Sequence, residues 1–309
     1  MSHKVLIISP SGAYFNRMDM NHYDIMNIVR QTSNIDVIDE FDASIIDKYD
    51  IIISDSWPNI DKKIVNNPRI RVGKFFQDYY QMEGKEYYSH EMYDFAILRY
   101  KTPVTVSNKI FDIPYKFYIS HHFDLNKYKN HGCEKIYDII LYGRRHAPLY
   151  PFRERMMELL LQNQHKYKIK YIPFCGYQNK PNIIRMEELS KLINQSWLTL
   201  SVPMNEDRDW DDFLQKFGEG SLSYALILGN IPKEAEVYYG DDYCRVTPNM
   251  TDTEILNVID NELANKVRIT EKTDRVYKTL QLALNVEDYG RKLYAVCEEI
   301  LKSTANVNV

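Results

Sequence analysis

Short apolar runs alternate with segments of helical periodicity along most of this 309-residue chain. The first run, residues 4–9, leads into a turn at Gly12, and a similar run at 50–55 ends in polar residues. Runs that are apolar throughout are typical of parallel strands buried on both faces, and parallel strands need crossover connections. The alternation therefore predicts an α/β fold built on doubly wound parallel sheets.

The alternation occurs twice. In the first half we expect strands at 4–9, 35–38, 50–55, 70–76, 95–98 and 104–107, with helices at 23–29 and 45–49. In the second half we expect strands at 135–143, 168–173, 197–202 and 243–246, with helices at 153–162, 186–193, 252–263, 266–284 and 286–301. Between them, 115–133 has weak periodicity, and the linker is placed at 118–134. The prediction is two Rossmann-like domains, 1–125 and 126–285, facing each other across a cleft, and a helical tail at 286–309.

Composition narrows the class of protein. With 44% hydrophobic residues, 27% charged residues and a formal net charge of -4, the chain is globular and poorly suited to bulk binding of nucleic acid. Its cysteines are too far apart for a zinc knuckle or a dense disulfide framework, which predicts reduced thiols; they are Cys133, Cys175, Cys244 and Cys297. No apolar stretch is long enough for a membrane span or a signal peptide, so a cytoplasmic protein is expected.

A glycine-rich stretch at 216–232 stands out in the second half. Gly218 and Gly220 precede an apolar run at 222–228 that ends at Gly229. We interpret this as a glycine-rich turn, a helix start, a stop and a short strand. A helix N-terminus beside glycines offers free N–H groups and a partial positive charge, which suit a phosphate. An ordinary buried helix is the alternative.

Strand ends supply the other candidate site residues, because ligands of doubly wound sheets bind beyond the carboxyl ends of the strands. Gly12, Asp55, Asp78 and Ser107 fall at such ends in the first half. Other common nucleotide and hydrolase motifs are absent: the sequence has no Gly-x-Gly-x-x-Gly after the first strand, no Walker P-loop and no Gly-x-Ser-x-Gly.

Several short motifs together resemble a known family. They are Tyr137-Asp-Ile-Ile-Leu-Tyr-Gly143 followed by Tyr150-Pro-Phe-Arg153, Leu192-Ile-Asn-Gln-Ser-Trp-Leu-Thr-Leu200, Ala225-Leu-Ile-Leu-Gly-Asn-Ile-Pro232 and Phe75-Phe-Gln-Asp-Tyr79. The chain thereby resembles the spore-maturation-protein-like (CgeB-like) branch of the GT-B glycosyltransferases, over most of 70–265. The resemblance implies a GT-B arrangement, an acceptor in the first domain, a nucleotide-sugar donor in the second, and a last helix packed back on the first domain.

Residues at strand ends and at the helix start are candidates for the donor site, although both arginines could instead be solvated surface residues. Arg144 and Arg145, after Gly143, and Lys216, Gly220 and Ser221 would hold the pyrophosphate. Relatives place a glutamate on the ribose five residues before the terminal glycine, but Tyr224 stands there, and Glu219 is the substitute. Base recognition is expected from the loops that contain Tyr177 and Pro203. The full set of predicted donor-binding residues is Gly12, Gly143, Arg144, Arg145, Tyr177, Pro203, Lys216, Glu219, Gly220, Ser221 and Tyr224.

An inverting transferase also needs a general base near the acceptor hydroxyl. Asp78 is the first candidate and Asp55 the second, with His121 and His122 near the linker as further options; a retaining enzyme would need none. The predicted activity is transfer of a sugar from a UDP-, GDP- or dTDP-linked donor to a glycan or other hydroxyl acceptor, without a cofactor or metal. Two alternatives stay open: a degenerate transferase that only binds nucleotide sugars, and a metal-dependent enzyme that uses Asp209 and Asp211.

Overall fold

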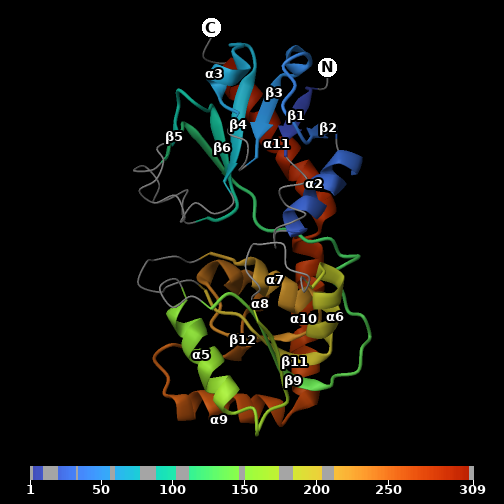
Figure 1. Cartoon of the computed structure of the whole chain (residues 1–309), viewed down its shortest axis with the longest axis vertical. Helices are drawn as coiled ribbons and strands as arrows, with labels where there is room; N and C mark the ends of the chain where they lie inside the picture. The colour runs from blue at the N-terminus through green and yellow to red at the C-terminus, as the bar shows by residue number, and fades with distance from the viewer. Residues whose placement is uncertain are drawn as a thin grey trace. The chain divides into compact units, whose positions relative to one another are not determined.

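The computed structural model of the chain describes residues 3–9, 20–32, 34–55, 60–76, 88–101, 111–145, 150–173, 184–203 and 212–305. The chain forms two compact units. Unit 1 consists of Met1–His122 together with Val286–Val309, and unit 2 consists of Phe123–Asn285. Each unit contains one large parallel sheet covered by helices (Figure 1).

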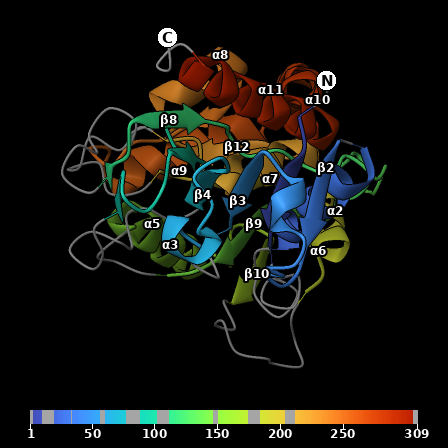
Figure 2. The ribbon, with the colours of Figure 1, turned by 90° about the horizontal axis from the view of Figure 1, so that it is seen from above.

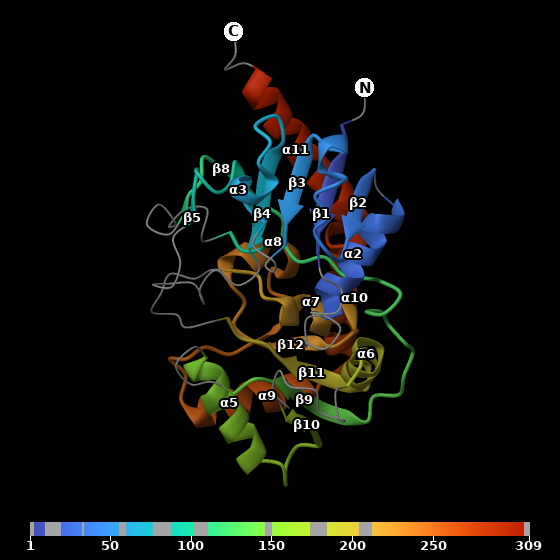
Figure 3. The ribbon, with the colours of Figure 1, turned by 45° about the horizontal axis from the view of Figure 1, so that its top comes forward.

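The sheet of unit 1 has six parallel strands in the order β2-β1-β3-β4-β6-β8. Their bounds are β1 Val5–Ile8, β2 Ile35–Ile38, β3 Ile51–Ser54, β4 Arg71–Phe76, β6 Phe95–Leu98 and β8 Tyr115–Tyr118. A separate two-stranded pair joins β5 (Tyr88–Ser89) to β7 (Phe111–Asp112). Figure 3 shows β4, β3, β1 and β2 side by side in that order. The strand order reverses between β1 and β3, which makes their carboxyl ends the switch point of this sheet.

Helices α2 (Met20–Thr32) and α11 (Val286–Ala305) cover one face of this sheet. Residues of both helices share a buried cluster with Ile7 of β1 and Ile53 of β3. The four-residue helix α3 (Lys62–Val65) lies on the other face, as the view from above shows (Figure 2). A short 3-10 helix, Ile46–Lys48, precedes β3. The last helix therefore belongs to the core of unit 1, although it is the final element of the chain.

Unit 2 contains five parallel strands in the order β10-β9-β11-β12-β13. They are β9 Tyr137–Gly143, β10 Ile169–Pro173, β11 Ser196–Leu200, β12 Leu226–Gly229 and β13 Cys244–Arg245. The helices are α5 Pro151–Gln162, α6 Met186–Asn194, α7 Gln215–Leu222, α8 Glu236–Tyr239, α9 Asp252–Leu263 and α10 Lys266–Ala283, with a 3-10 turn at Lys233–Ala235. Helices α5 and α9 pack on one face and α6 on the other (Figure 1). This sheet reverses its strand order between β9 and β11.

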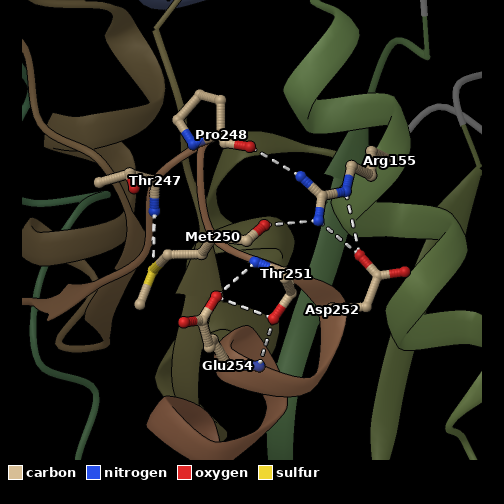
Figure 4. Close-up of polar contacts among 7 residues, drawn as sticks. All are labelled: Arg155, Thr247, Pro248, Met250, Thr251, Asp252 and Glu254. Carbon is tan, nitrogen blue, oxygen red and sulfur yellow. Dashed lines mark hydrogen bonds and ion pairs between the residues drawn. The ribbon is translucent and has the colours of Figure 1, made fainter.

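The loop before α9 is fastened by Arg155 of α5 (Figure 4). Its guanidinium donates to the carbonyls of Pro248 at 2.8 Å and Met250 at 2.6 Å, and to Asp252 Oδ1. Thr251 and Glu254 form a capping box that satisfies N–H groups of the first turn of α9. One arginine thus joins α5 to the start of α9.

The predicted fold class is confirmed: the chain is α/β, with two parallel Rossmann-like sheets and a helical C-terminal region. Strands expected at 35–38 and 95–98 and the helix expected at 252–263 have the predicted bounds. The stretch at 115–118 was placed in a weakly periodic segment, but it forms β8, the edge strand of unit 1. The strand expected at 104–107 lies outside the described residues. Within the part of the chain that the structure describes, no helix is both long and apolar enough to cross a membrane.

The interpretation of the glycine-rich stretch was wrong. Helix α7 begins at Gln215, so Gly218 and Gly220 lie inside it, and the apolar run that we read as a helix contains strand β12. A Cβ on Gly218 would overlap the Phe123 ring, and one on Gly220 would come within 2.5 Å of Thr199 Cγ2. The glycines therefore allow close packing of a buried helix, as in the alternative reading, and do not form a phosphate-binding turn.

Candidate anion site at the switch point of unit 2

The carboxyl ends of β9 and β11 meet at the point where the strand order of unit 2 reverses. In doubly wound sheets this position leaves a crevice, because the flanking connections leave in opposite directions. Gly143 ends β9, and Val202 and Pro203 follow β11. Polar side chains from α5 and α7 converge here.

Lys216 reaches this point from the first turn of α7. Its Nζ donates a hydrogen bond to the carbonyl of Tyr142 and lies 4.2 Å from the centre of the Tyr142 ring. Gly143 has a φ of +89°, and a Cβ at this position would overlap the Lys216 ammonium group. Glycine at 143 therefore allows the positive φ and leaves space for the Lys216 ammonium group. The N-terminus of α7 adds its own partial positive charge at the same place.

Arg153 brings a second cation to the site from the first turn of α5. It is 4% exposed, its guanidinium stacks on the Tyr150 ring at 3.8 Å, and its Nη2 donates to the carbonyl of Val202 at 3.2 Å. Arg153 belongs to the Tyr150-Pro-Phe-Arg153 motif but was not predicted as a site residue. Pro151 at the first helical position is the signal that places it, because it fixes the start of α5.

Glu219 contributes the one carboxylate of what we call the Tyr142 cluster, which consists of Tyr142, Arg153, Lys216 and Glu219. Its Oε2 accepts from the Tyr142 hydroxyl at 3.2 Å and its Oε1 from Gln215 Nε2 at 2.8 Å. Glu219 is 5% exposed. The predicted ribose contact by Glu219 stays a prediction, and the observed bonds give it a role in orienting Tyr142 and offsetting positive charge.

The cluster therefore holds two basic groups and one acidic group in a largely buried setting. Burial lowers the pKa of Lys216 well below its usual value, the Arg153 charge lowers it further, and Glu219 raises it in part. Burial and the Glu219 charge raise the pKa of Tyr142 well above its usual value, so this phenol stays neutral. Two basic side chains next to a helix N-terminus suit a multiply charged anion such as a diphosphate.

The predicted arginine pair does not form a fork toward the site. Arg145 is bound by two acids of α5: its Nε donates to Glu154 at 2.8 Å and its Nη2 to Glu158 at 2.9 Å. Its pKa is raised mainly by the hydrogen bond to Glu154. Arg144 is exposed. A role for Arg144 in holding the pyrophosphate stays a prediction.

Gly220 and Ser221 cannot supply helix N-terminal donors, contrary to the prediction, because both lie in the second half of α7. The Ser221 hydroxyl is 3.0 Å from that of Tyr239, and the residue is 2% exposed. Their backbone carbonyls cap the helix instead: Ala225 N–H donates to Gly220 and Tyr224 N–H to Ser221. This is the Schellman arrangement of a helix end.

Tyr224 lies at the wrong edge of the sheet for a ribose contact. It follows the end of α7 with a φ of +63° and precedes β12, so it stands at the amino ends of the strands. Its carbonyl accepts from Lys135 at 2.5 Å, and its hydroxyl donates to Asp274 at 2.5 Å. Lys135 also bonds the carbonyl of Ser196, the first residue of β11. Tyr224 is therefore a structural residue, far along the strand direction from Gly143.

In unit 1, Asp55 lies at the switch point, directly after β3. It is 0% exposed, and its Oδ2 accepts from Ser9 Oγ at 2.6 Å, which ties the ends of β1 and β3 together. Its carbonyl accepts from the buried Lys74 at 3.0 Å. The bonds to Ser9 and Lys74 indicate a structural role, whereas the predicted catalytic role stays a prediction.

His121 and His122 were named as further options for the general base, and each is 1% exposed. His122 Nδ1 is 2.8 Å from the Ser120 carbonyl and Nε2 is 2.9 Å from Lys292 Nζ. Burial and the Lys292 charge lower the pKa of His122 to about 4. The neutral ring donates from Nδ1 and accepts a hydrogen bond from Lys292 at Nε2, so it is a structural group of unit 1.

Other predicted residues lie outside the described part of the chain: Gly12, Asp78, Tyr177, Asp209 and Asp211. Among the described residues, no group of three or more His, Cys, Asp or Glu side chains has the arrangement of a metal site. Pro203 is half-buried at the end of the segment after β11, at the predicted edge of the sheet.

Comparison with known proteins places the fold in a class. No family model and no curated protein sequence matches the chain. Solved structures do match over nearly their full length. HepE of Anabaena, solved with UDP and glucose, has a TM-score of 0.61 at 11% identity and covers 96% of this chain and 100% of its own. BGT of phage T4, solved with its UDP-glucose substrate, has a TM-score of 0.61 at 13% identity and covers 97% of this chain and 99% of its own.

Sucrose-phosphate synthase of Thermosynechococcus elongatus is a further match, with a TM-score of 0.60 at 8% identity over 97% of this chain and 100% of the other. The chain has the GT-B fold of these glycosyltransferases. The likeness is one of fold, and the narrower resemblance to the CgeB-like branch stays a prediction.

Proposed function

We propose that this protein is a glycosyltransferase that takes its sugar from a nucleotide-diphosphate sugar bound at the Tyr142 cluster of unit 2. The observation that carries the proposal is the meeting of Lys216 and Arg153 at the switch point of a GT-B sheet. Structures of similar fold contain UDP or UDP-glucose, which supports a donor of this class.

In the proposed mechanism, Lys216 contacts the diphosphate directly and the buried Arg153 acts through its charge. The bond between the sugar and the diphosphate breaks heterolytically, so negative charge develops on the leaving phosphate oxygen. A cation held beside that oxygen in a partly desolvated site stabilises the transition state more than the ground state. Glu219 holds Tyr142 through its hydroxyl and is the one carboxylate beside the two basic side chains of the cluster.

The acceptor is proposed to be the hydroxyl of a glycan or glycoconjugate, bound by unit 1, with Asp78 as the first candidate for the general base. The net charge of -4 disfavours a polyanionic acceptor. A DNA-modifying β-glucosyltransferase nevertheless has a similar fold, with a TM-score of 0.62. A duplex DNA substrate is therefore included among the acceptors to be tested. BGT was also solved with UDP and Mn2+, so each assay is run with and without a divalent cation.

The test begins with thermal shifts in UDP, GDP, dTDP and CMP, since a ligand that binds only the folded state raises the melting temperature. The matching radiolabelled nucleotide sugar is then incubated with glycan and DNA acceptors, and released nucleotide and labelled acceptor are quantified. We expect a shift with one uridine, guanosine or thymidine diphosphate and transfer of label. No shift with any nucleotide would contradict the donor site. Binding without release or transfer would favour a protein that only binds nucleotide sugars.

A further inference from the structure

Two side chains of opposite charge type lie three residues apart on α7, at Lys216 and Glu219. At this spacing an acid and a base on the same helix are neighbours and can form an ion pair. Among the interactions of the described residues, Glu219 acts on Lys216 through its charge, but the two side chains share no hydrogen bond or salt bridge. Other contacts therefore hold the carboxylate away from the lysine.

Tyr142 contacts both side chains at different places. Lys216 Nζ lies 4.2 Å from the centre of the Tyr142 ring and donates to the Tyr142 carbonyl. Glu219 Oε2 instead accepts from the Tyr142 hydroxyl at 3.2 Å. The ring face and the hydroxyl belong to one rigid phenol, so these contacts keep the acid and the base apart.

Gln215, the first residue of α7, holds the other oxygen of Glu219. Its Nε2 donates to Glu219 Oε1 at 2.8 Å across one turn of the helix. An ionised carboxylate only accepts hydrogen bonds, so the amide nitrogen of Gln215 and not its oxygen must face it. Because the amide is neutral, it fixes the position of the carboxylate without adding a charge to the Tyr142 cluster.

We propose that Gln215 is a positioning residue of the donor site, which holds the Glu219 carboxylate away from Lys216 and so keeps Lys216 available for the diphosphate. This rests on the proposed function and adds a residue to the same site. Without the amide, the carboxylate is held by Tyr142 more weakly and can turn toward Lys216. Opposite charges attract more strongly in a largely buried setting than in water, so the nucleotide sugar would first have to break that ion pair.

Calorimetry with UDP-, GDP- and dTDP-glucose tests the proposal. Gln215→Met keeps the length of the side chain and removes the amide, and Tyr142→Phe removes the hydroxyl but keeps the ring against Lys216. We expect each to bind the nucleotide sugar roughly three- to tenfold more weakly, the effect of one hydrogen bond. Lys191→Met is the control, because it removes the partner of Glu187 four residues away on α6, and it should bind like the wild type. Melting temperatures check that each variant is folded.

The same substitution is then made in two further backgrounds, Glu219→Gln and Lys216→Met. An ion pair needs both charged groups, so Gln215→Met should change the affinity by less than about twofold in either background. A loss as large as in the wild-type background, in either case, would overturn the proposal, because Gln215 would then act on the ligand or on the helix directly. If Gln215→Met does not fold, Tyr142→Phe is compared in the same two backgrounds.

A second measurement needs no ligand. An ion-paired lysine holds its proton more firmly and is acylated more slowly. With limiting acetic anhydride, labelling of Lys216 relative to Lys135 should fall about threefold or more in Gln215→Met and recover in the double variant with Glu219→Gln. Equal labelling of Lys216 in the wild type and Gln215→Met would overturn the proposal. Failure of every nucleotide sugar to bind the wild type would instead overturn the proposed function and leave the labelling result unaffected.

Discussion

The two sheets have the same kind of switch point with opposite chemistry. In unit 1, the ends of β1 and β3 are joined by a hydrogen bond from Ser9 to Asp55, a carboxylate with no exposed surface. In unit 2, the ends of β9 and β11 hold Lys216 and Arg153, each bonded to a backbone carbonyl. The first switch point also has a buried lysine, Lys74, whose Nζ donates to the carbonyl of Asp55, so it has one basic and one acidic side chain. The second switch point has two basic side chains and the single carboxylate of Glu219, and this surplus of basic groups is what suits an anion.

This contrast teaches that topology alone does not locate a ligand site. Strand reversal creates the position in both units. Whether it binds a ligand depends on side chains contributed by the crossover helices, and in unit 2 these come from the first turns of α5 and α7. Fold similarity to UDP-sugar enzymes fits this assignment, but the charge distribution distinguishes the two positions.

The largest expected effect comes from Lys216→Met. Losing a charge-assisted hydrogen bond of about 1.5–3 kcal/mol should weaken binding of the nucleotide sugar roughly 10- to 100-fold in calorimetry. Lys135→Met is the matched control, because Lys135 is another half-buried lysine of unit 2 that bonds carbonyls, but at the amino ends of the strands. An equal loss of nucleotide-sugar affinity in Lys216→Met and Lys135→Met would contradict a binding site at the carboxyl ends of the strands.

The next effect concerns unit 1 and its stability toward acid. His122 has a folded pKa of about 4 against an ordinary value near 6.5, so below about pH 6.5 the unfolded chain binds a proton that the folded chain does not. The stabilisation is complete above pH 6.5, and at pH 5 about 2 kcal/mol of it is lost. Chemical denaturation of the wild type and His122→Gln at pH 7 and pH 5 measures this. A wild type that loses no more stability than the variant would contradict it.

Gly143→Ala should act on both the backbone and the site. A positive φ costs a residue with a Cβ about 1–2 kcal/mol, and here the methyl group would also displace the Lys216 ammonium. Gly132→Ala is the matched control, since Gly132 has a φ of +67° with open space around it. Both variants should melt lower, but only Gly143→Ala should bind the nucleotide sugar less tightly. If Gly143→Ala bound the nucleotide sugar as tightly as the wild type, Gly143 would not be part of the binding site.

The smallest effect is expected far from the switch point, at the capping box of α9 shown in Figure 4. Thr251→Ala removes one cap and should cost about 1 kcal/mol of stability. Thr251→Ser, which keeps the hydroxyl, is the control. Neither substitution should change nucleotide-sugar affinity in calorimetry, and a change would mean that the site extends to this loop.

The sequence was sufficient for the fold class and for most strands and helices, because continuous apolar runs and helical periodicity are local signals. It misled at α7, where glycines that look like a flexible turn allow Phe123 and Thr199 to pack against a helix. Of the proposed site residues, Lys216 and Glu219 were found through the same stretch, although for the wrong reason. Arg153 was missed because its burial against Tyr150 and Val202 depends on tertiary contacts. Asp55, His121 and His122 were selected as candidate site residues, but all three are buried. Their burial could not be predicted because polar residues surround them in the sequence.

The most direct test of the central claim is protection of individual lysines in the wild-type protein. Lysines are acylated with a limiting amount of acetic anhydride at about pH 8, with and without the nucleotide sugar that gives the largest thermal shift, and each site is quantified by mass spectrometry. Burial lowers the pKa of Lys135 to about 7 and also lowers that of Lys216, which favours the reactive neutral amine at both positions. The ligand should suppress labelling of Lys216 and leave Lys135 unchanged. Equal labelling of Lys216 with and without ligand would contradict a donor site at the switch point of unit 2.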